Sequence, residues 1–316
     1  MTFLYDALGV VFGPIMAVIY AVVKNYGVAI VLFTVFCRLL MLPSAVSQQK
    51  NQAKNQRIQY KMRKITEKYK GDRQRLAQEQ QEFYRREGYN PMSAGCSGGM
   101  VLQFPIIFGL VAAIYRPLQY TVKTSTEVIK ALSDQAAEIL SDPKLTAANL
   151  QVQLRIAENI DKFKGLFGAG KLDMAQFGKI HDFAANFKFM GLQLGLTPKE
   201  GGSWAYYLIP VLAGVSSMVT SVYTMLRQRK TNPEQQQNAV MMAVMSLGMP
   251  IFSAVLSLSF PVGIGIYWIV SSLAGLVQIV ALSYTHPPQK MLAKSMVDET
   301  IERRSRENSR KKVAEI

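Results

Sequence analysis

The chain has 316 residues, of which 49% are hydrophobic, and it carries a formal net charge of +15. The apolar residues are gathered into blocks close to the ~20 residues that a membrane-spanning helix needs, which argues against an ordinary soluble domain. Only two histidines occur, both outside these blocks, and the blocks hold no Asp or Glu. This excludes a HExxH zinc site, a buried Ser–His dyad and an intramembrane aspartyl site, so no enzyme, metal or cofactor is expected.

The first 25 residues form the predicted exterior amino end. Within them, Leu8–Val23 is apolar but short, and Gly9, Gly13 and Pro14 interrupt it. We expect a helix that lies in the outer membrane interface, while a full span is the alternative. The first predicted transmembrane helix follows at 26–43.

Residues 44–90 form the predicted basic helical hairpin. The first helix, Ser44–Lys70, carries apolar positions at helical spacing: Ile58, Met62, Ile65 and Tyr69. Gly71 is expected to stop this helix, Asp72 to cap the next one, and Gly88 to end it. These few apolar residues form only a narrow contact surface between the two helices, so we expect the helices to pack weakly.

Four more transmembrane helices are predicted, at 91–115, 204–226, 239–258 and 262–283. Between the second and third lies a helical segment at 116–203, with helices expected over Ser125–Leu140 and Lys144–Phe163 and a turn at Asp142–Pro143. A loop at 227–238 and a tail at 284–316 complete the chain. The fold class is therefore an all-α polytopic membrane protein with five spanning helices.

Charge predicts the orientation. Residues 50–86 hold twelve Lys or Arg and far fewer acidic residues, while three basic residues follow the third span and eight lie in the tail. The 116–203 segment is nearly balanced. Under the positive-inside rule the hairpin, the loop and the tail are cytoplasmic and the balanced segment is outside. Cys37 and Cys96 then lie on the cytoplasmic side, where no disulfide is expected.

Arg38 is the only charged residue well inside a predicted span. Thr34 lies one turn before it, so the hydroxyl and the guanidinium share a helix face. The side chain could reach the lipid headgroups along its aliphatic stem, as arginines near helix ends do. We instead expect Arg38 to face a wet cavity inside the bundle, because charged side chains within membranes usually do.

Other predicted spans also offer polar or small side chains for a common groove. Gln103 precedes Phe104–Pro105 in the second span, and the fifth carries Tyr267, Ser271 and Gln278, with Gly275 in the same row. Ser217 and Ser221 share a face of the third span. Such residues are often packing contacts between membrane helices. Because several spans carry them, we favour a hydrophilic groove with an unneutralised positive charge.

Several segments, in order, resemble the YidC/Oxa/Alb family of membrane protein insertases. They are NYGVAIVLFTVFCRLLMLP, EFYRREGYNP, GGMVLQFPIIFGL, WAYYLIPVLAGVSSMVTS and FPVGIGIYWIVSSLAGLVQ. The pattern is most similar to the compact Gram-positive type, since no large extra periplasmic domain and no lipoprotein signal are seen. The segment after the second span is longer than in compact members.

The resemblance implies a five-helix core around a groove open to the cytoplasm and to lipid, in a bacterial plasma membrane. Arg38 matches the family's groove arginine, Thr34 its partner, and Gln103 the glutamine of the second core helix. Tyr267 and Trp268 occupy the aromatic pair that contacts nascent substrates, although Trp268 replaces a commoner tyrosine.

The implied partners are nascent membrane proteins, membrane lipid, and ribosomes through the basic hairpin and tail. A Sec translocon and the signal recognition particle pathway are possible further partners, and no direct DNA binding is expected. An anion transporter or channel that uses Arg38 as its ion site is the main alternative, although transporters usually show internal repeats and none is seen here. A ribosome-tethering membrane scaffold is a third possibility.

Overall fold

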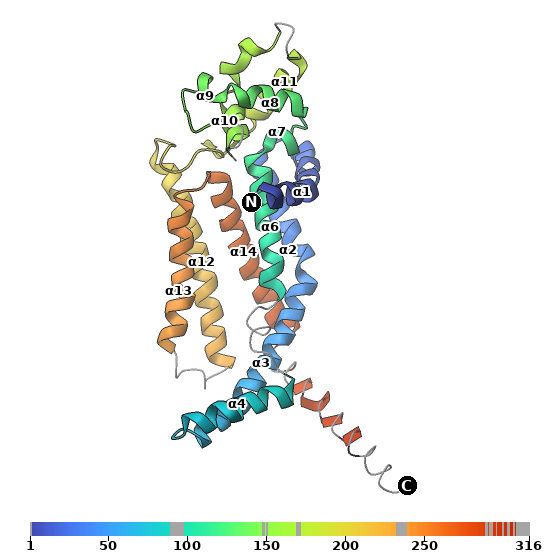
Figure 1. Ribbon diagram of the computed structural model, residues 1–316, viewed down its shortest axis with the longest axis vertical. Coiled ribbons are helices and arrows are strands. Elements are labelled where there is room, and N and C mark those ends of the chain that lie inside the picture. Colours follow the sequence, from blue (N-terminus) through green and yellow to red (C-terminus); the bar gives the residue numbers. More distant parts are fainter. Residues whose placement is uncertain are drawn as a thin grey trace. The chain divides into compact units, whose positions relative to one another are not determined.

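The computed structural model describes residues 2–88, 98–146, 149, 151–168, 172–231 and 239–287, with scattered positions between 290 and 307. The described chain is mostly helical, as the sequence predicts (Figure 1). It divides into two compact units. The first comprises 1–40, 103–225 and 238–276, and the second 41–102, 226–237 and 277–316.

In the first unit, α1 (Thr2–Val23) packs against α2 (Tyr26–Leu40) and the short α7 (Pro117–Tyr120). Figure 1 shows α1 nearly end-on and α2 from the side, so α1 crosses α2 rather than continuing its direction. Met16 is fully buried, whereas Val18 and Val22 on the same helix are 64% and 80% exposed. A helix with one apolar face packed on protein and another exposed is suited to an interface, where we expect α1 to lie.

The helix α6 (Gly98–Tyr115) lies close to both of these helices. The Tyr26 hydroxyl donates a hydrogen bond of 2.9 Å to the Ala113 carbonyl, which joins α2 to α6. Gly109 leaves room for the ring of Phe12 from α1, which a side chain at this position would meet. Cys37 on α2 is buried and carries a free thiol, while Cys96 lies outside the described residues.

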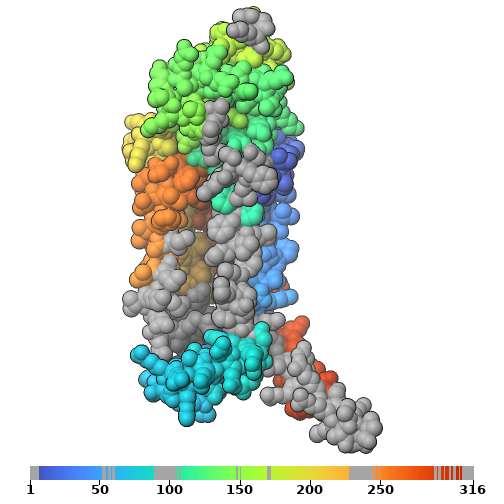
Figure 2. Space-filling model, viewed as in Figure 1, coloured from blue at the N-terminus to red at the C-terminus, as the bar shows by residue number. Residues whose placement is uncertain are grey.

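The segment between α6 and the third expected span is built of short elements that form one continuous surface, green in Figure 2. After α7 they are α8 (Thr126–Asp134), α9 (Ala136–Ile139), α10 (Val152–Glu158), the 3-10 helix η1 (Ile160–Leu166), α11 (Met174–Ala185), and the antiparallel strands β1 (Lys188–Phe189) and β2 (Leu192–Gln193).

Two helix predictions in this segment are wrong in their extent. The helix expected over Ser125–Leu140 is divided at Gln135, and the one expected from Lys144 begins only at Val152. The Asp142 carboxylate accepts a hydrogen bond from the Lys144 amide. The Asn149 side chain bonds the Lys144 carbonyl at 2.8 Å and the Gln151 amide at 2.8 Å. Such local side-chain bonds satisfy the backbone in a turn and compete with a helix.

Several contacts among the described residues attach the segment to the bundle. Tyr26 of α2 packs edge-on against Phe183 of α11, with ring centroids 5.3 Å apart. At the start of α14 (Val262–Thr285), the amides of Val262 and Gly263 donate to the carbonyls of Leu196 and Leu194 at 3.0 and 2.9 Å. These bonds satisfy amides that a helix amino end leaves without intrahelical partners.

Among the described residues, two helices are long and apolar enough to cross a membrane, at Trp204–Arg227 within α12 (Trp204–Thr231) and at Val262–Thr285. The first part of α3 (Leu42–Lys68) follows α2 after a break at Met41. If these two helices are counted as one span, the number of candidate spans is three. The 18-residue α6 and the 19-residue α13 (Ala239–Ser257) contain Pro105 and Pro250. The expected number of five spans remains a prediction.

In the second unit, α3 packs against α4 (Arg73–Glu87). The Asp72 carboxylate accepts hydrogen bonds from the amides of Gln74 and Arg75, and Gly88 ends α4 in the left-handed conformation with φ of 59°. Both roles were predicted from the sequence and are confirmed. Lys61 and Glu87 form an ion pair of 2.7 Å between the two helices.

Candidate functional site

The helices of the first unit expose apolar side chains on their outer faces. On α2, α12 and α13 the exposed ones are Leu32, Val35, Phe36, Leu39, Val211, Leu212, Val215, Val219, Val244, Ile251, Phe252 and Val255. Water-soluble monomers rarely expose so much apolar surface, whereas contact between apolar side chains and lipid tails carries no free-energy penalty. These faces are therefore suited to the hydrocarbon of a membrane.

Arg38 and two predicted site residues lie together inside this apolar exterior. The Arg38 Nη2 donates a hydrogen bond of 2.5 Å to the Ser271 hydroxyl on α14. Ser271 is 5% exposed and Thr34 is 1% exposed, with the Thr34 hydroxyl bonded to the Ile30 carbonyl of its own helix at 2.6 Å. Within the described part of the chain, no carboxylate forms an ion pair with Arg38. Among the described residues, the guanidinium is thus positioned by a neutral hydroxyl.

Two further residues of α14, one turn to either side of Ser271, help to define the position of Arg38. Tyr267, one turn before Ser271, is 3% exposed. Gly275 lies one turn after Ser271, and a Cβ atom there would lie 3.6 Å from the Arg38 Nη2. A glycine at this position lets the guanidinium lie against the backbone of α14. The row predicted from the sequence therefore faces Arg38 at two of its members, Ser271 and Gly275.

Ser217 lies in a second polar contact, between α12 and α14. Its hydroxyl is 3.0 Å from that of Ser272, and the Thr220 hydroxyl donates to the carbonyl of Ser272 at 3.2 Å and to that of Ser216 at 3.0 Å. The sequence reasoning missed Ser216, Thr220 and Ser272. Their helical spacing and the paired serines were the available signal, but such residues also occur as ordinary packing contacts.

The structure does not test the placement of the other predicted site residues beside Arg38. Trp268 is partly exposed and packs edge-on against Phe260, with ring centroids 5.7 Å apart. Ser221 is half-buried on α12, and Gln278 belongs to the part of α14 in the second unit. The Gln103 side chain lies outside the described residues. The full set of predicted groove residues remains a prediction.

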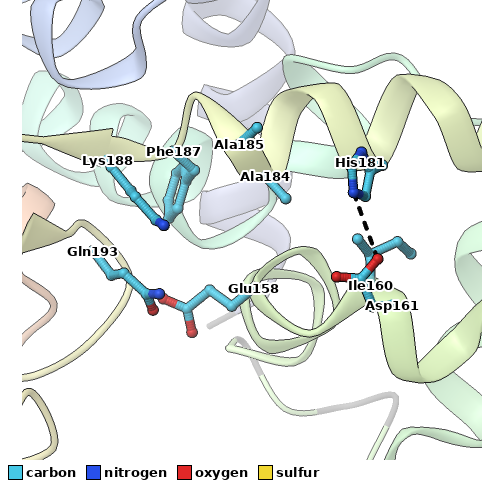
Figure 3. Close-up of a pocket in the computed structure, with 9 residues that line it drawn as sticks. All are labelled: Glu158, Ile160, Asp161, His181, Ala184, Ala185, Phe187, Lys188 and Gln193. Carbon is cyan, nitrogen blue, oxygen red and sulfur yellow. Dashed lines mark ion pairs between the residues drawn. The ribbon is translucent and has the colours of Figure 1, made fainter. Parts of the chain in front are cut away.

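A separate pocket of about 170 Å³ lies in the segment between α6 and α12 (Figure 3). It is lined by Glu158, Ile160, Asp161, His181, Ala184, Ala185, Phe187, Lys188 and Gln193. These residues come from α10, η1, α11 and the β1–β2 hairpin, which follow one another along the chain. No sequence pattern indicated a pocket there.

Glu158 is the most buried charged group of this pocket. Its side chain is 4% exposed, and its Oε2 lies 3.4 Å from the Nη1 of Arg155. The other terminal nitrogen of Arg155 is paired with Glu200, which also accepts from the Thr197 amide and hydroxyl at 3.0 and 2.9 Å. Burial raises the pKa of Glu158 to about 7, although Arg155 acts in the opposite direction.

Stability should therefore depend on pH through Glu158. Because its pKa is raised in the folded state, its contribution to stability is present below the ordinary carboxyl pKa and is lost as pH rises through about 7. We expect Glu158→Gln to be more stable than the wild type at pH 8, by on the order of 2 kcal/mol, and nearly equal to it at pH 4, below the ordinary carboxyl pKa. Hydrogen exchange of the α10 amides at both pH values measures this. Glu138→Gln, at an exposed position, should change neither value.

Apolar outer faces around a partly buried arginine and a few buried hydroxyls define a mostly helical membrane protein. Residues 18–289 match the family described as "60Kd inner membrane protein". The chain belongs to this family, which is the YidC/Oxa/Alb family that its motifs resemble.

Three relatives show the range of the similarity. The chain is 28% identical over 265 residues to the membrane protein insertase YidC of Zymomonas mobilis, a match covering 84% of this chain and 35% of that protein. It is 26% identical to the membrane protein insertase MisCA of Bacillus subtilis, over 79% of this chain and 67% of that one. For YidC 2 of Bacillus anthracis the identity is 24%, over 81% and 71%. The chain thus spans about a third of the Zymomonas protein and about two thirds of the Bacillus proteins.

Proposed function

We propose that the protein is a membrane protein insertase, which passes nascent membrane proteins from a cytoplasm-facing groove into the bilayer. Family membership supports this, as do the printed names of its relatives. The observation that carries the proposal is the Arg38–Ser271 bond, which holds a guanidinium without a carboxylate partner among the described residues, in a bundle whose outer faces are apolar.

The mechanism needs no covalent chemistry. Polar or acidic parts of the incoming chain enter the groove, where Arg38 attracts carboxylates more strongly than it does in water because the surrounding dielectric is low. Thr34 and Tyr267, both buried in the bundle, are the proposed neighbours of this path. The apolar part of the substrate then moves along α12 and α14 into lipid, driven by the burial of its own side chains.

The proposed topology has five spans, at 26–43, 91–115, 204–226, 239–258 and 262–283, in a bacterial plasma membrane. The amino end and the 116–203 segment are outside, with residues 8–23 in the outer interface. The hairpin at 44–90, the loop at 227–238 and the tail at 284–316 are cytoplasmic. The charge distribution supports this orientation, since the basic residues gather in these three regions.

The basic hairpin and tail gather ribosomes and nascent chains by charge. Their charge is suited to the phosphates of ribosomal RNA, whose binding by Lys and Arg is salt-dependent. Cooperation with a Sec translocon and delivery by the signal recognition particle pathway are further parts of the proposal.

Site-specific photocrosslinking tests the path of the substrate. A probe at Thr34 or Tyr267 should react with a ribosome-bound single-span protein that carries an acidic tail, because both positions face the interior. Probes at Phe36 on α2 and Val255 on α13, which are 45% and 60% exposed on outer faces, serve as matched controls. Crosslinks spread evenly over the four positions would contradict a defined interior path.

A further inference from the structure

The pocket beside Glu158 is lined in a way that suits one kind of ligand. Its lining combines apolar side chains, from Ile160, Ala184, Ala185 and Phe187, with charged and polar ones. In Figure 3, the Lys188 side chain and the carboxylate of Glu158 extend toward the same space, with the Gln193 amide beside them. A ligand here meets both an apolar surface and a cluster of charges.

Glu158 has unused hydrogen-bonding capacity. Its Oε1 lies beside Gly195, whose backbone acts to lower the pKa of the carboxyl, but within the described residues this oxygen makes no hydrogen bond of ordinary geometry. A buried carboxylate oxygen without a partner costs free energy, and a proton or a cation removes that cost. Burial of the carboxyl also raises the pKa of Glu158, against the opposing effects of Arg155 and of the Gly195 backbone.

The charges that face the pocket add up to a negative field. Arg155 is shared between Glu158 and Glu200, so this trio carries one net negative charge when all its members are ionised. Asp161 on η1 adds another, with its Oδ1 3.6 Å from the Nε2 of His181. Lys188 supplies the opposing positive charge from β1, at an exposed position from which it can turn away.

A metal ion does not fit this arrangement. Within the part of the chain that the structure describes, no three His, Cys, Asp or Glu side chains gather to hold one. Hard cations such as Ca²⁺ require six or more oxygen ligands. An ammonium group needs only a few acceptors, and the methylene groups that carry it can lie against the apolar side chains.

We propose that this pocket binds a primary ammonium group on an aliphatic stem, such as a lysine side chain of a polypeptide, with Glu158 as its counter-ion. Asp161 adds attraction at the rim. Lys188 competes for the same position, because its own ammonium is the group that the pocket accepts. The proposal concerns this segment alone and does not depend on the insertase mechanism.

Binding of Nα-acetyl-lysine amide to the full-length protein in nanodiscs tests the proposal, with the norleucine analogue as the uncharged control. Saturable binding of the lysine compound is expected at pH 8, and about tenfold weaker binding at pH 5, where Glu158 is protonated. Glu158→Gln should lose about tenfold in affinity at pH 8 and little at pH 5. Lys188→Ala should bind more tightly than the wild type, because a competing ammonium has been removed.

Three results would overturn the proposal: equal binding of the norleucine compound, no binding of the lysine compound, or unchanged affinity in Glu158→Gln. Glu158→Gln keeps the shape of the side chain, and hydrogen exchange of α10 reports whether it is folded. Asp161→Asn on the exposed rim provides a second variant, expected to weaken binding about threefold. Failure of these results leaves the insertase proposal unaffected, since its readout is client insertion.

Discussion

Replacing Arg38 with alanine is expected to reduce the insertion of a client with an acidic tail about tenfold or more, whereas Arg38→Lys retains most of it. The reason is that the substrate's carboxylates lose the charge that attracts them into a low-dielectric interior, and a charged hydrogen bond of this kind is worth about 1.5–3 kcal/mol. Lysine keeps the positive charge but lacks the planar guanidinium with its several hydrogen-bond donors, so we expect a small loss of insertion. Complementation of an insertase-depleted bacterium, with insertion followed by protease protection, measures both variants.

Ser271→Ala is the matched control for this experiment. It removes the hydroxyl that holds the Arg38 Nη2 at 2.5 Å but leaves the charge in place. We expect an intermediate defect of about threefold, since the guanidinium loses one neutral partner. Full rescue by Arg38→Ala would contradict an essential role of this charge. No rescue by well-expressed wild type would instead favour an anion transporter, which anion flux into liposomes would reveal.

Gly275→Leu is expected to impair insertion about as strongly as Arg38→Ala, without any change of charge. A Cβ atom at this position meets the Arg38 Nη2 at 3.6 Å, which is ordinary contact, but the further atoms of a leucine need the space that the guanidinium fills. The Arg38 side chain is then displaced from Ser271. Overfilling a packed site typically costs about 1–3 kcal/mol. The same insertion assay measures the effect, and blue-native electrophoresis confirms that the variant is folded.

Gly275→Ala is the control, because its single added carbon fits without displacing Arg38. A second control is Gly248→Leu on α13, where a side chain would meet no atom within 4 Å. Equal insertion by Gly275→Leu and Gly275→Ala would show that the position of the guanidinium against α14 does not matter.

Features set by a few neighbouring residues could be predicted from the sequence. The cap of α4 by Asp72 and its end at Gly88 depend on bonds within three residues, and both are found as expected. The helical rows Thr34–Arg38 and Tyr267–Ser271–Gly275 follow from the period of the helix alone. The helix expected from Lys144 failed because hydrogen bonds of the Asn149 side chain, also local but hard to weigh against helix propensity, stabilise a turn.

Features set by contacts between distant residues required the tertiary structure. The bond between Arg38 and Ser271 joins residues 233 positions apart, and no sequence period indicates which row of α14 faces α2. The Arg155–Glu200 pair, 45 positions apart, likewise depends on how the turn before α12 folds back onto α10. The burial that leaves the Glu158 Oε1 without a partner arises from the same packing.

The sequence by itself therefore determined the class of the protein, its family and the presence of a charged residue within an apolar helix. These depend on composition, on helical periodicity and on motifs that are read along the chain. The tertiary structure decided which neutral hydroxyl holds Arg38, which glycine makes room for it, and where a buried carboxylate meets a pocket. The physical reason is that the energy of a polar group in an apolar interior depends on the partners that packing brings to it, and these partners are distant in the chain.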